Sequence, residues 1–230
     1  MKRFWTSAEV RSEGAGFAIA LDGRPVRTPA RAALIVPSQA LADAIAEEWS
    51  AQGETIDPRA MPLTGLANAA IDRVGADPAG FARSIASFGE SDLLYYRADH
   101  PQRLLDRQRE AWDPLLAWAR RRFDVDFVIG TGIVHLPQPE DTVARLRHAV
   151  AALKPFELAA LSPLVTIGGS LIAGLAALER HVSADDAWQA VTVDDRFQLE
   201  EWGADEEAEA ALDNRRGEFF AAARFLTLLD

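Results

Sequence analysis

The stretch Ala33-Leu-Ile-Val-Pro-Ser-Gln-Ala-Leu-Ala-Asp-Ala-Ile-Ala-Glu-Glu-Trp49 divides the sequence into a β-rich beginning and a helical remainder. Its first four residues have the apolar, β-branched character of a strand. The residues that follow place Leu41, Ile45 and Trp49 on one helical face, so we expect Trp49 to be buried with the other two. Ser38 stands where the N-cap of this helix should lie. The sequence therefore predicts a change from strands to helices after residue 37.

The residues before this change indicate a small antiparallel sheet. Gly16-Phe-Ala-Ile-Ala-Leu21 is a second apolar strand candidate, and it runs directly into Asp22-Gly23. Asp-Gly between extended segments favours a two-residue hairpin turn with both residues at positive φ. We therefore predict a small β-rich domain over residues 1–37.

Beyond residue 37, helical periodicity alternates with residues that end or begin helices. Asp77-Pro78 and Asp113-Pro114 each resemble an N-cap followed by a first-turn proline, and the second predicts a kinked or two-piece helix. Short strands are expected near 126–136, at 127–129 and 133–136. Helices are expected over residues 38–52, 62–74, 77–88, 101–122, 139–152, 163–180, 183–191, 194–202 and 204–229. The predicted fold class is α+β, mostly α, with a larger multi-helical domain over residues 38–230 after the antiparallel β domain.

Composition excludes several classes of protein. The 230 residues include no cysteine, which excludes disulfides, thiolate metal sites and cysteine nucleophiles. The longest apolar run, Pro163–Leu178, has 16 residues, whereas a membrane span needs about 20. We interpret it as one buried helix in which Gly168-Gly169-Ser170 allows close packing, and we expect no membrane insertion. The N-terminus has no apolar signal region, so a cytoplasmic bacterial protein is expected.

The net charge of −11 is concentrated in one segment. Residues 182–214 contain eleven acids and a single base, Arg196. Nucleic acid and anionic membranes are poor partners for such a surface.

A search for catalytic chemistry finds no motif. Gly130-Thr-Gly132 is not followed by the third glycine of a dinucleotide fingerprint, and none of the four histidines has zinc-ligand spacing. We therefore expect no catalytic residue, cofactor, metal or small-molecule substrate. Three interpretations of the acidic cluster at 194–209 stay open. It could bind the metal of a metal-dependent enzyme, which is the alternative to a non-catalytic function. It could also be a solvated acidic face, or a docking surface for a partner, formed beside the aromatic Trp202.

Ten short motifs, in order, resemble one known family over nearly the whole chain. They are Arg3-Phe-Trp5, Leu21-Asp-Gly-Arg-Pro-Val-Arg-Thr-Pro29, Leu41-Ala-x-Ala-Ile-Ala-x-Glu-Trp49 with Gln52, Met61-Pro-Leu-Thr64, Ala70-Ile-Asp72, Asp92-Leu-Leu-x-Tyr-Arg-Ala98, Gln108 with Trp112-Asp-Pro-Leu-Leu-x-Trp118, Phe156-Glu-Leu-Ala-Ala-Leu161, Gly169-Ser-Leu-Ile172 and Gln198-x-x-x-Trp-Gly203. The family consists of assembly chaperones that act on the alpha subunit of the catalytic head of F-type ATP synthase. Phe88, Tyr95 and Phe197 depart from the family's usual residues without loss of apolar character.

The resemblance implies a protein that is not an enzyme. It implies a chaperone that binds the unassembled alpha subunit, prevents its aggregation and releases it to the beta subunit. It also implies a β-rich N-terminal domain, a helical C-terminal domain, and a location in the bacterial cytoplasm or, in eukaryotes, the mitochondrial matrix. The family's functional clue is an acidic position in the C-terminal region. The candidate partner-binding residues here are Glu200, Glu201, Trp202, Asp205 and Glu206.

Overall fold

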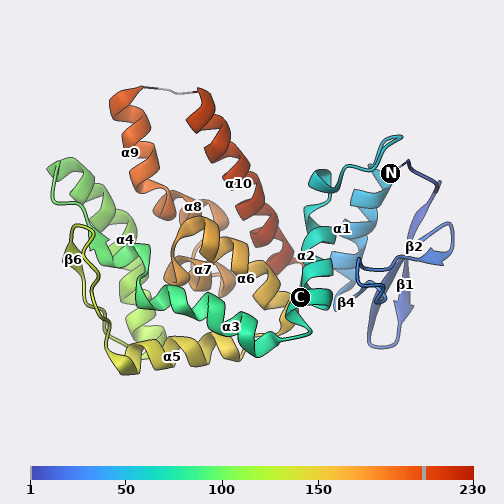
Figure 1. Ribbon diagram of the computed structural model, residues 1–230, viewed down its shortest axis with the longest axis horizontal. Coiled ribbons are helices and arrows are strands. Elements are labelled where there is room, and N and C mark those ends of the chain that lie inside the picture. The colour runs from blue at the N-terminus through green and yellow to red at the C-terminus, as the bar shows by residue number, and fades with distance from the viewer. Residues whose placement is uncertain (1, 204–205) are drawn as a thin grey trace. The chain divides into compact units, whose positions relative to one another are not determined.

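The computed structural model describes residues 2–203 and 206–230 (Figure 1). Packing divides the chain into two compact units. Unit 1 consists of Met1–Pro78, Lys154–Ala160 and Ala221–Asp230, and unit 2 consists of Ala79–Leu153 and Leu161–Phe220. The predicted domain boundary at residue 37 follows the change in secondary structure, whereas these units follow packing, so that boundary stays a prediction.

Unit 1 contains the predicted antiparallel sheet. Its strands are β1 (Ala8–Glu13), β2 (Gly16–Leu21), β3 (Arg24–Pro25) and β4 (Ile35–Val36), and β2 pairs antiparallel with each of the other three. The sequence indicated β2 and β4 but not β1. The reason is that β1, Ala-Glu-Val-Arg-Ser-Glu, is mostly exposed and carries little apolar alternation.

The hairpin turn between β2 and β3 has the predicted geometry. Asp22 and Gly23 have φ values of 46° and 80°, as a two-residue turn of this type requires. The Asp22 carboxylate accepts hydrogen bonds from the backbone N–H groups of Thr6 (3.0 Å) and Ser7 (2.9 Å). These bonds lower the pKa of Asp22 to about 2, and the bond from the Ser7 N–H contributes most.

Substituting Gly23→Val is expected to lower the free energy of unfolding by about 1 to 2 kcal/mol, because a β-branched residue at positive φ is strained. A steric clash does not cause this loss of stability, because a Cβ at this position would contact only the end of the Arg11 side chain, at 3.4 Å. Chemical denaturation of the variant measures the cost. An unchanged transition would contradict the assignment of strain to this turn.

The helices of unit 1 share a buried core with the sheet. They are α1 (Gln39–Ser50), α2 (Pro62–Ala69) with a π-helical continuation over Ala70–Val74, and a 3-10 turn at Pro58–Ala60. The start of α6 (Pro155–Gly168) and the end of α10 (Glu206–Thr227) also belong to this unit. Ser38 caps α1 as predicted, since its hydroxyl accepts from the N–H of Leu41 (3.2 Å). Leu41 and Ile45 are fully buried with Ile19 and Phe225.

The prediction that Trp49 is buried is wrong in degree. Its side chain is only half-buried and packs edge-to-face on Trp5, with ring centroids 5.1 Å apart. Trp49 lies in the last turn of α1, at the margin of the core that Leu41 and Ile45 fill. Helical spacing gives the face of a residue but not its distance from the edge of the core.

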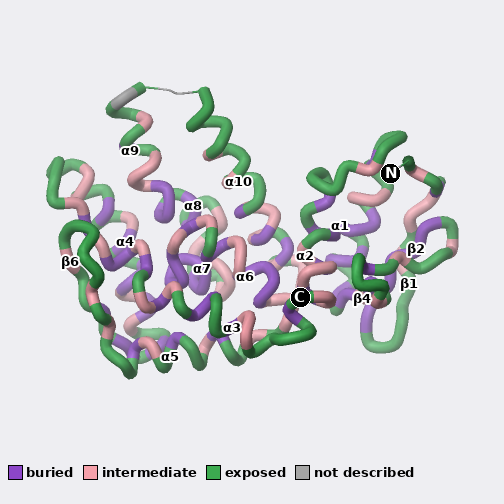
Figure 2. The backbone as a smooth tube through the Cα atoms, in the orientation of Figure 1, coloured by how far each residue is buried: buried purple, intermediate pink, exposed green. Residues whose placement is uncertain are grey.

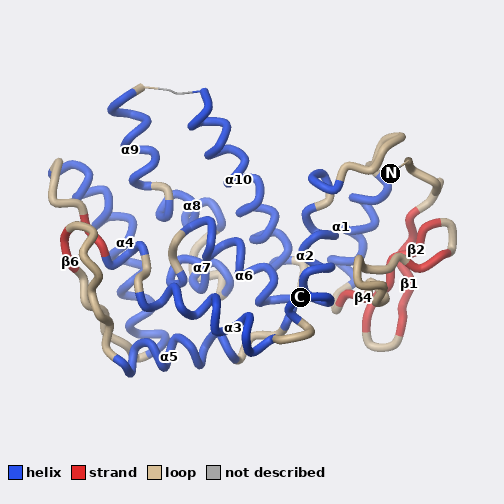
Figure 3. The backbone as a smooth tube through the Cα atoms, viewed as in Figure 1, coloured by secondary structure: helices blue, strands red, loops and turns tan. Residues whose placement is uncertain are grey.

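Unit 2 is helical apart from one short parallel pair of strands (Figure 3). Figure 2 shows the buried residues gathered on the inward faces of its helices. Its elements are α3 (Pro78–Ala86), 3-10 turns at Ser87–Glu90 and Leu93–Tyr95, β5 (Tyr96–Arg97), α4 (Gln102–Phe123), β6 (Gly130–Thr131), α5 (Glu140–Ala151), most of α6 (Pro155–Gly168), α7 (Leu171–Leu178), α8 (Ala184–Val191), α9 (Val193–Trp202) and most of α10 (Glu206–Thr227).

The predicted single helix over residues 163–180 is wrong. The structure has two helices, α6 and α7, with α6 starting at Pro155. Gly169 has a φ of 66° and ends α6, and the Ser170 hydroxyl caps α7 by accepting from the N–H of Ala173 (3.0 Å). Continuous apolar sequence therefore concealed a break that a glycine at positive φ and a serine cap produce.

Two smaller predictions also fail. The strand near 126–136 is β6, which pairs in parallel with β5, so the strands expected at 127–129 and 133–136 are absent from the described residues. The two-piece form expected for the helix around Pro114 is wrong, because α4 continues through Pro114, and Asp113 is inside the helix with its carboxylate paired with Arg97. No helix among the described residues combines the length and the apolar character that crossing a bilayer requires.

Candidate partner-binding surface

A buried carboxylate joins two of the motifs that carry the family resemblance. Asp92 is fully buried and accepts from the N–H groups of Leu94 (3.0 Å) and Ile172 (2.9 Å), while Ser170 and Leu171 also donate to it. Burial raises the pKa of Asp92 to about 6 in spite of these bonds. The carboxylate thus fixes the turn before β5 to the start of α7.

A second buried network attaches α4 to its neighbours. The Arg97 guanidinium, 7% exposed, donates to the Asp113 carboxylate (2.6 Å) and to the Gln108 carbonyl (2.9 Å). Gln108 in turn accepts from the N–H of Ala98 (2.8 Å) and donates to the Asp194 carboxylate (2.8 Å). Because Asp194 is in the first turn of α9, this network positions the helix that carries the candidate site.

Two acids of the candidate site are ion-paired within the molecule. Glu200 pairs with Arg107 (2.7 Å), and Glu201 pairs with Arg103. Both arginines also lie over the Phe197 ring, with guanidinium carbons 5.0 and 5.4 Å from its centroid. All four charged side chains are substantially exposed, so the pairs stabilise little. The pairs instead reduce the negative charge of this surface, because each arginine neutralises one carboxylate.

The first turn of α10 is more available to a partner. Glu206 is exposed and makes no ion pair with any described residue, and the neighbouring positions up to Ala210 are exposed as well (Figure 2). The positive end of the helix dipole stabilises carboxylates in the first turn of a helix, even without an ion pair. Of the remaining candidates, Asp205 lies outside the described residues, as does the side chain of Trp202.

Metal binding finds no support in this region. Within residues 2–203 and 206–230, no group of three or more histidine, aspartate or glutamate side chains could hold a metal ion. The acids of α9 instead face arginines and a glutamine of α4 and α10, as the 3.1 Å pair between Asp195 and Arg215 also shows.

An exposed apolar loop is a feature that the sequence did not reveal. Ile133 is 98% and Val134 76% exposed, although both were assigned to a strand. The loop is held in shape by Gln138, whose amide accepts from the N–H of Val128 (3.0 Å) and donates to its carbonyl (2.9 Å). Exposed apolar side chains in an ordered loop are typical of contact sites for other proteins. The alternation of glycine and aliphatic residues was the available signal, but it indicates strands equally well.

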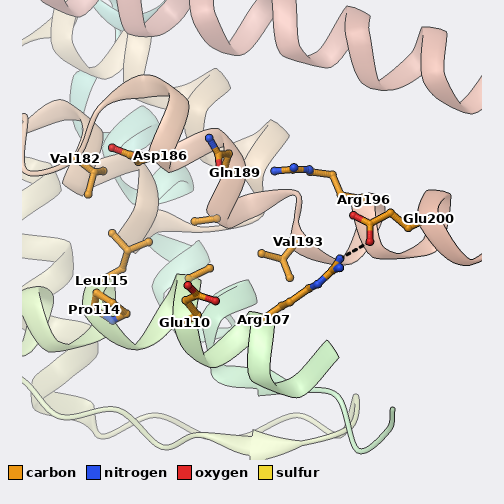
Figure 4. Close-up of a pocket in the computed structure, with 12 residues that line it drawn as sticks. Arg107, Glu110, Pro114, Leu115, Val182, Asp186, Gln189, Val193, Arg196 and Glu200 are labelled. Atoms are coloured by element: carbon orange, nitrogen blue, oxygen red, sulfur yellow. Dashed lines mark ion pairs between the residues drawn. The ribbon is translucent and has the colours of Figure 1, made fainter. Parts of the chain in front are cut away.

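A pocket of about 620 Å³ opens between α4, α8 and α9 (Figure 4). Arg107 and Glu200, the ion pair described above, form part of its lining. The candidate acidic residues on α9 therefore border a concave site, which no spacing in the sequence indicated.

Comparison with known proteins identifies relatives over the full chain. The family model described as "ATP12 chaperone protein" matches residues 2–120. The mitochondrial protein atp12 of Schizosaccharomyces pombe is 26% identical over 219 residues, which cover 90% of this chain and 75% of that protein.

Solved structures of relatives have the same fold. Atp12 from Paracoccus denitrificans is 44% identical with a TM-score of 0.94, and an aspartate-to-lysine variant of it gives 0.95; each match covers 100% of this chain and 98% of the other. A protein from Agrobacterium tumefaciens is 38% identical with a TM-score of 0.94, over 100% of this chain and 86% of that one. The fold class inferred from the sequence is confirmed by these structures, and the chain belongs to the ATP12 chaperone family.

Proposed function

We propose that the protein is an assembly chaperone for F-type ATP synthase that binds the unassembled alpha subunit and releases it to the beta subunit. Membership of a chaperone family, with the fold shared over the full chain, is the observation that carries this proposal. We further propose that it acts in the bacterial cytoplasm and without catalysis.

The physical task explains the kind of surface that is needed. An unassembled subunit exposes an apolar interface that aggregates unless another protein covers it. The chaperone must bind that interface less tightly than the native partner does, so that assembly can displace it. A surface that combines exposed acids with a few exposed apolar residues provides fast encounter and moderate affinity.

The acidic residues Glu200, Glu201, Asp205 and Glu206, with Trp202, are proposed to belong to the surface that binds the alpha subunit. Reversal of Glu206 to lysine is expected to weaken binding about tenfold, and to lower the free energy of unfolding by no more than about 1 kcal/mol, because Glu206 is exposed and unpaired among the described residues and loses only its interaction with the α10 dipole. Glu201→Lys also breaks the pair with Arg103, so a cost of up to about 1 kcal/mol is expected there. Titration with purified alpha subunit at low and high salt measures both effects.

Glu13→Lys is the matched control, since Glu13 is an exposed acid of β1 outside this surface. Its affinity should equal that of the wild type. If all four reversals at the candidate positions bind as the wild type does, at both salt concentrations, the acidic surface serves only solubility.

The exposed apolar loop is proposed as a second contact. Ile133→Ser combined with Val134→Ser is expected to weaken binding of the alpha subunit at least about tenfold, because two aliphatic side chains would no longer be buried on association. Both side chains are largely exposed in the free protein, so the thermal transition should not move. Undiminished affinity of the double variant would remove the loop from the binding surface.

A further inference from the structure

The pocket between α4, α8 and α9 has an apolar base and charged walls. The base includes Ala111, Pro114 and Leu115 from α4 and Val193 from α9. Its volume of about 620 Å³ exceeds what one side chain fills, and it opens to solvent. Such a base can cover the methylene groups of a long side chain.

Glu110 and Arg196 point toward the pocket from opposite walls (Figure 4). Neither forms an ion pair with a described residue, whereas Arg107 and Glu200 at the pocket's edge neutralise each other at 2.7 Å. The remaining acid of the lining, Asp186, accepts a hydrogen bond from the Ser183 hydroxyl (2.7 Å) through its carboxylate. The lining therefore has one more carboxylate than guanidinium groups.

Pro114 adds a backbone acceptor on the same wall. A proline inside a helix has no N–H to donate to the carbonyl four residues earlier, which here is that of Glu110. Residues four apart lie on one helical face, and both Glu110 and Pro114 line the pocket. The α4 wall thus offers a carboxylate and a carbonyl that lacks its helical donor.

We propose that this pocket receives a lysine or arginine side chain of the unassembled alpha subunit. Its methylene groups would lie on Pro114, Leu115 and Val193, and its cationic head would donate to the carboxylate and carbonyl of Glu110. Arg196 on the opposite wall keeps the head on the Glu110 side by repulsion. The inference rests on the proposed function, because it names a group of that same partner.

Filling the pocket tests this proposal by steric exclusion. Ala111→Trp is expected to weaken binding of purified alpha subunit by at least about tenfold, since the indole would occupy the space of the incoming side chain. The matched control is Ala149→Trp, an equally half-buried alanine that lines a different pocket, of about 590 Å³, between α4, α5 and α7. That variant should bind as the wild type does.

Charge substitutions test whether the side chain that enters the pocket is positively charged. Glu110→Gln, which keeps size and exposure, is expected to weaken binding about fivefold, while Arg196→Gln should strengthen binding because it removes the repulsion of the cationic head. If Arg196→Gln weakens binding and Glu110→Gln does not, the bound side chain is acidic and the proposal of a basic side chain is overturned. Because Glu110→Gln is conservative and exposed, it tests the proposal even where Ala111→Trp does not fold.

The same binding experiments separate the pocket proposal from the proposed chaperone function. If the wild type binds and both Ala111→Trp and Glu110→Gln bind equally well, the pocket proposal is overturned and the chaperone function stands. If the wild type itself does not bind the alpha subunit, both are overturned.

Discussion

Replacing Asp92 by alanine is expected to lower the free energy of unfolding by about 3 to 4 kcal/mol. The substitution leaves the buried N–H groups of Leu94 and Ile172 and the Ser170 hydroxyl without their acceptor, and each unpaired buried group costs about 1 to 3 kcal/mol. The contacts connect the turn before β5 with α7, so packing in unit 2 should loosen as well. Urea denaturation measures the loss. A cost below about 1 kcal/mol would mean that this network does not hold the unit together.

The contribution of Asp92 to the free energy of unfolding should depend on pH. The pKa of Asp92 is raised to about 6 in the folded protein, so folding favours its protonated form. Its contribution to stability is therefore complete below the unfolded pKa of 3.8 and is lost as the pH rises through 6. Asp92→Asn cannot titrate, so its cost relative to the wild type should be about 1 kcal/mol larger at pH 5 than at pH 7. A pH-independent difference would contradict the raised pKa.

Trp112→Ala is expected to cost about 3 to 5 kcal/mol, because the side chain is fully buried and leaves a large cavity. The indole also donates to the Ala190 carbonyl (2.7 Å) in the last turn of α8, and the Arg97 guanidinium lies 4.9 Å from its ring centroid. Trp112→Phe should therefore still cost about 1 to 3 kcal/mol, since it leaves that carbonyl unpaired. Thermal and urea unfolding measure both losses.

Trp118 on the same helix provides the control. It is nearly buried and stacks on His181, but it donates no hydrogen bond to a described side chain or backbone group in the way that Trp112 does. Trp118→Phe should accordingly cost less than Trp112→Phe. Equal costs would show that size alone, and not the bond to α8, determines the effect at Trp112.

Local signals in the sequence predicted local structure well. The Asp22-Gly23 turn and the Ser38 cap depend on neighbouring residues alone, and both are confirmed. Ser183 caps α8 by the same kind of local contact, since its hydroxyl accepts from the N–H of Asp186 (3.0 Å). Features that depend on tertiary packing were missed. An apolar run gives no sign that Gly169 adopts positive φ, or that Pro114 is accommodated inside a continuous helix.

The candidate site shows the same limit. The acids of α9 were visible as a charge cluster, but their arginine partners on α4 are almost one hundred positions away in the sequence. Only the folded chain distinguishes the paired Glu200 and Glu201 from Glu206, which forms no ion pair with a described residue. The pocket could not be predicted because α4, α8 and α9 each contribute part of its lining. The buried network of Asp92 and Arg97 accounts structurally for several of the motifs that carry the family resemblance.

We propose that this chain keeps the unassembled alpha subunit soluble and passes it to the beta subunit. Light scattering of purified alpha subunit, with and without an equimolar amount of this protein, tests it most directly, followed by addition of beta subunit and size-exclusion chromatography. We expect suppressed scattering, and then an alpha–beta complex that no longer contains this protein. Scattering that rises as fast in its presence, or a complex with the alpha subunit that persists after addition of the beta subunit, would contradict the proposed chaperone function.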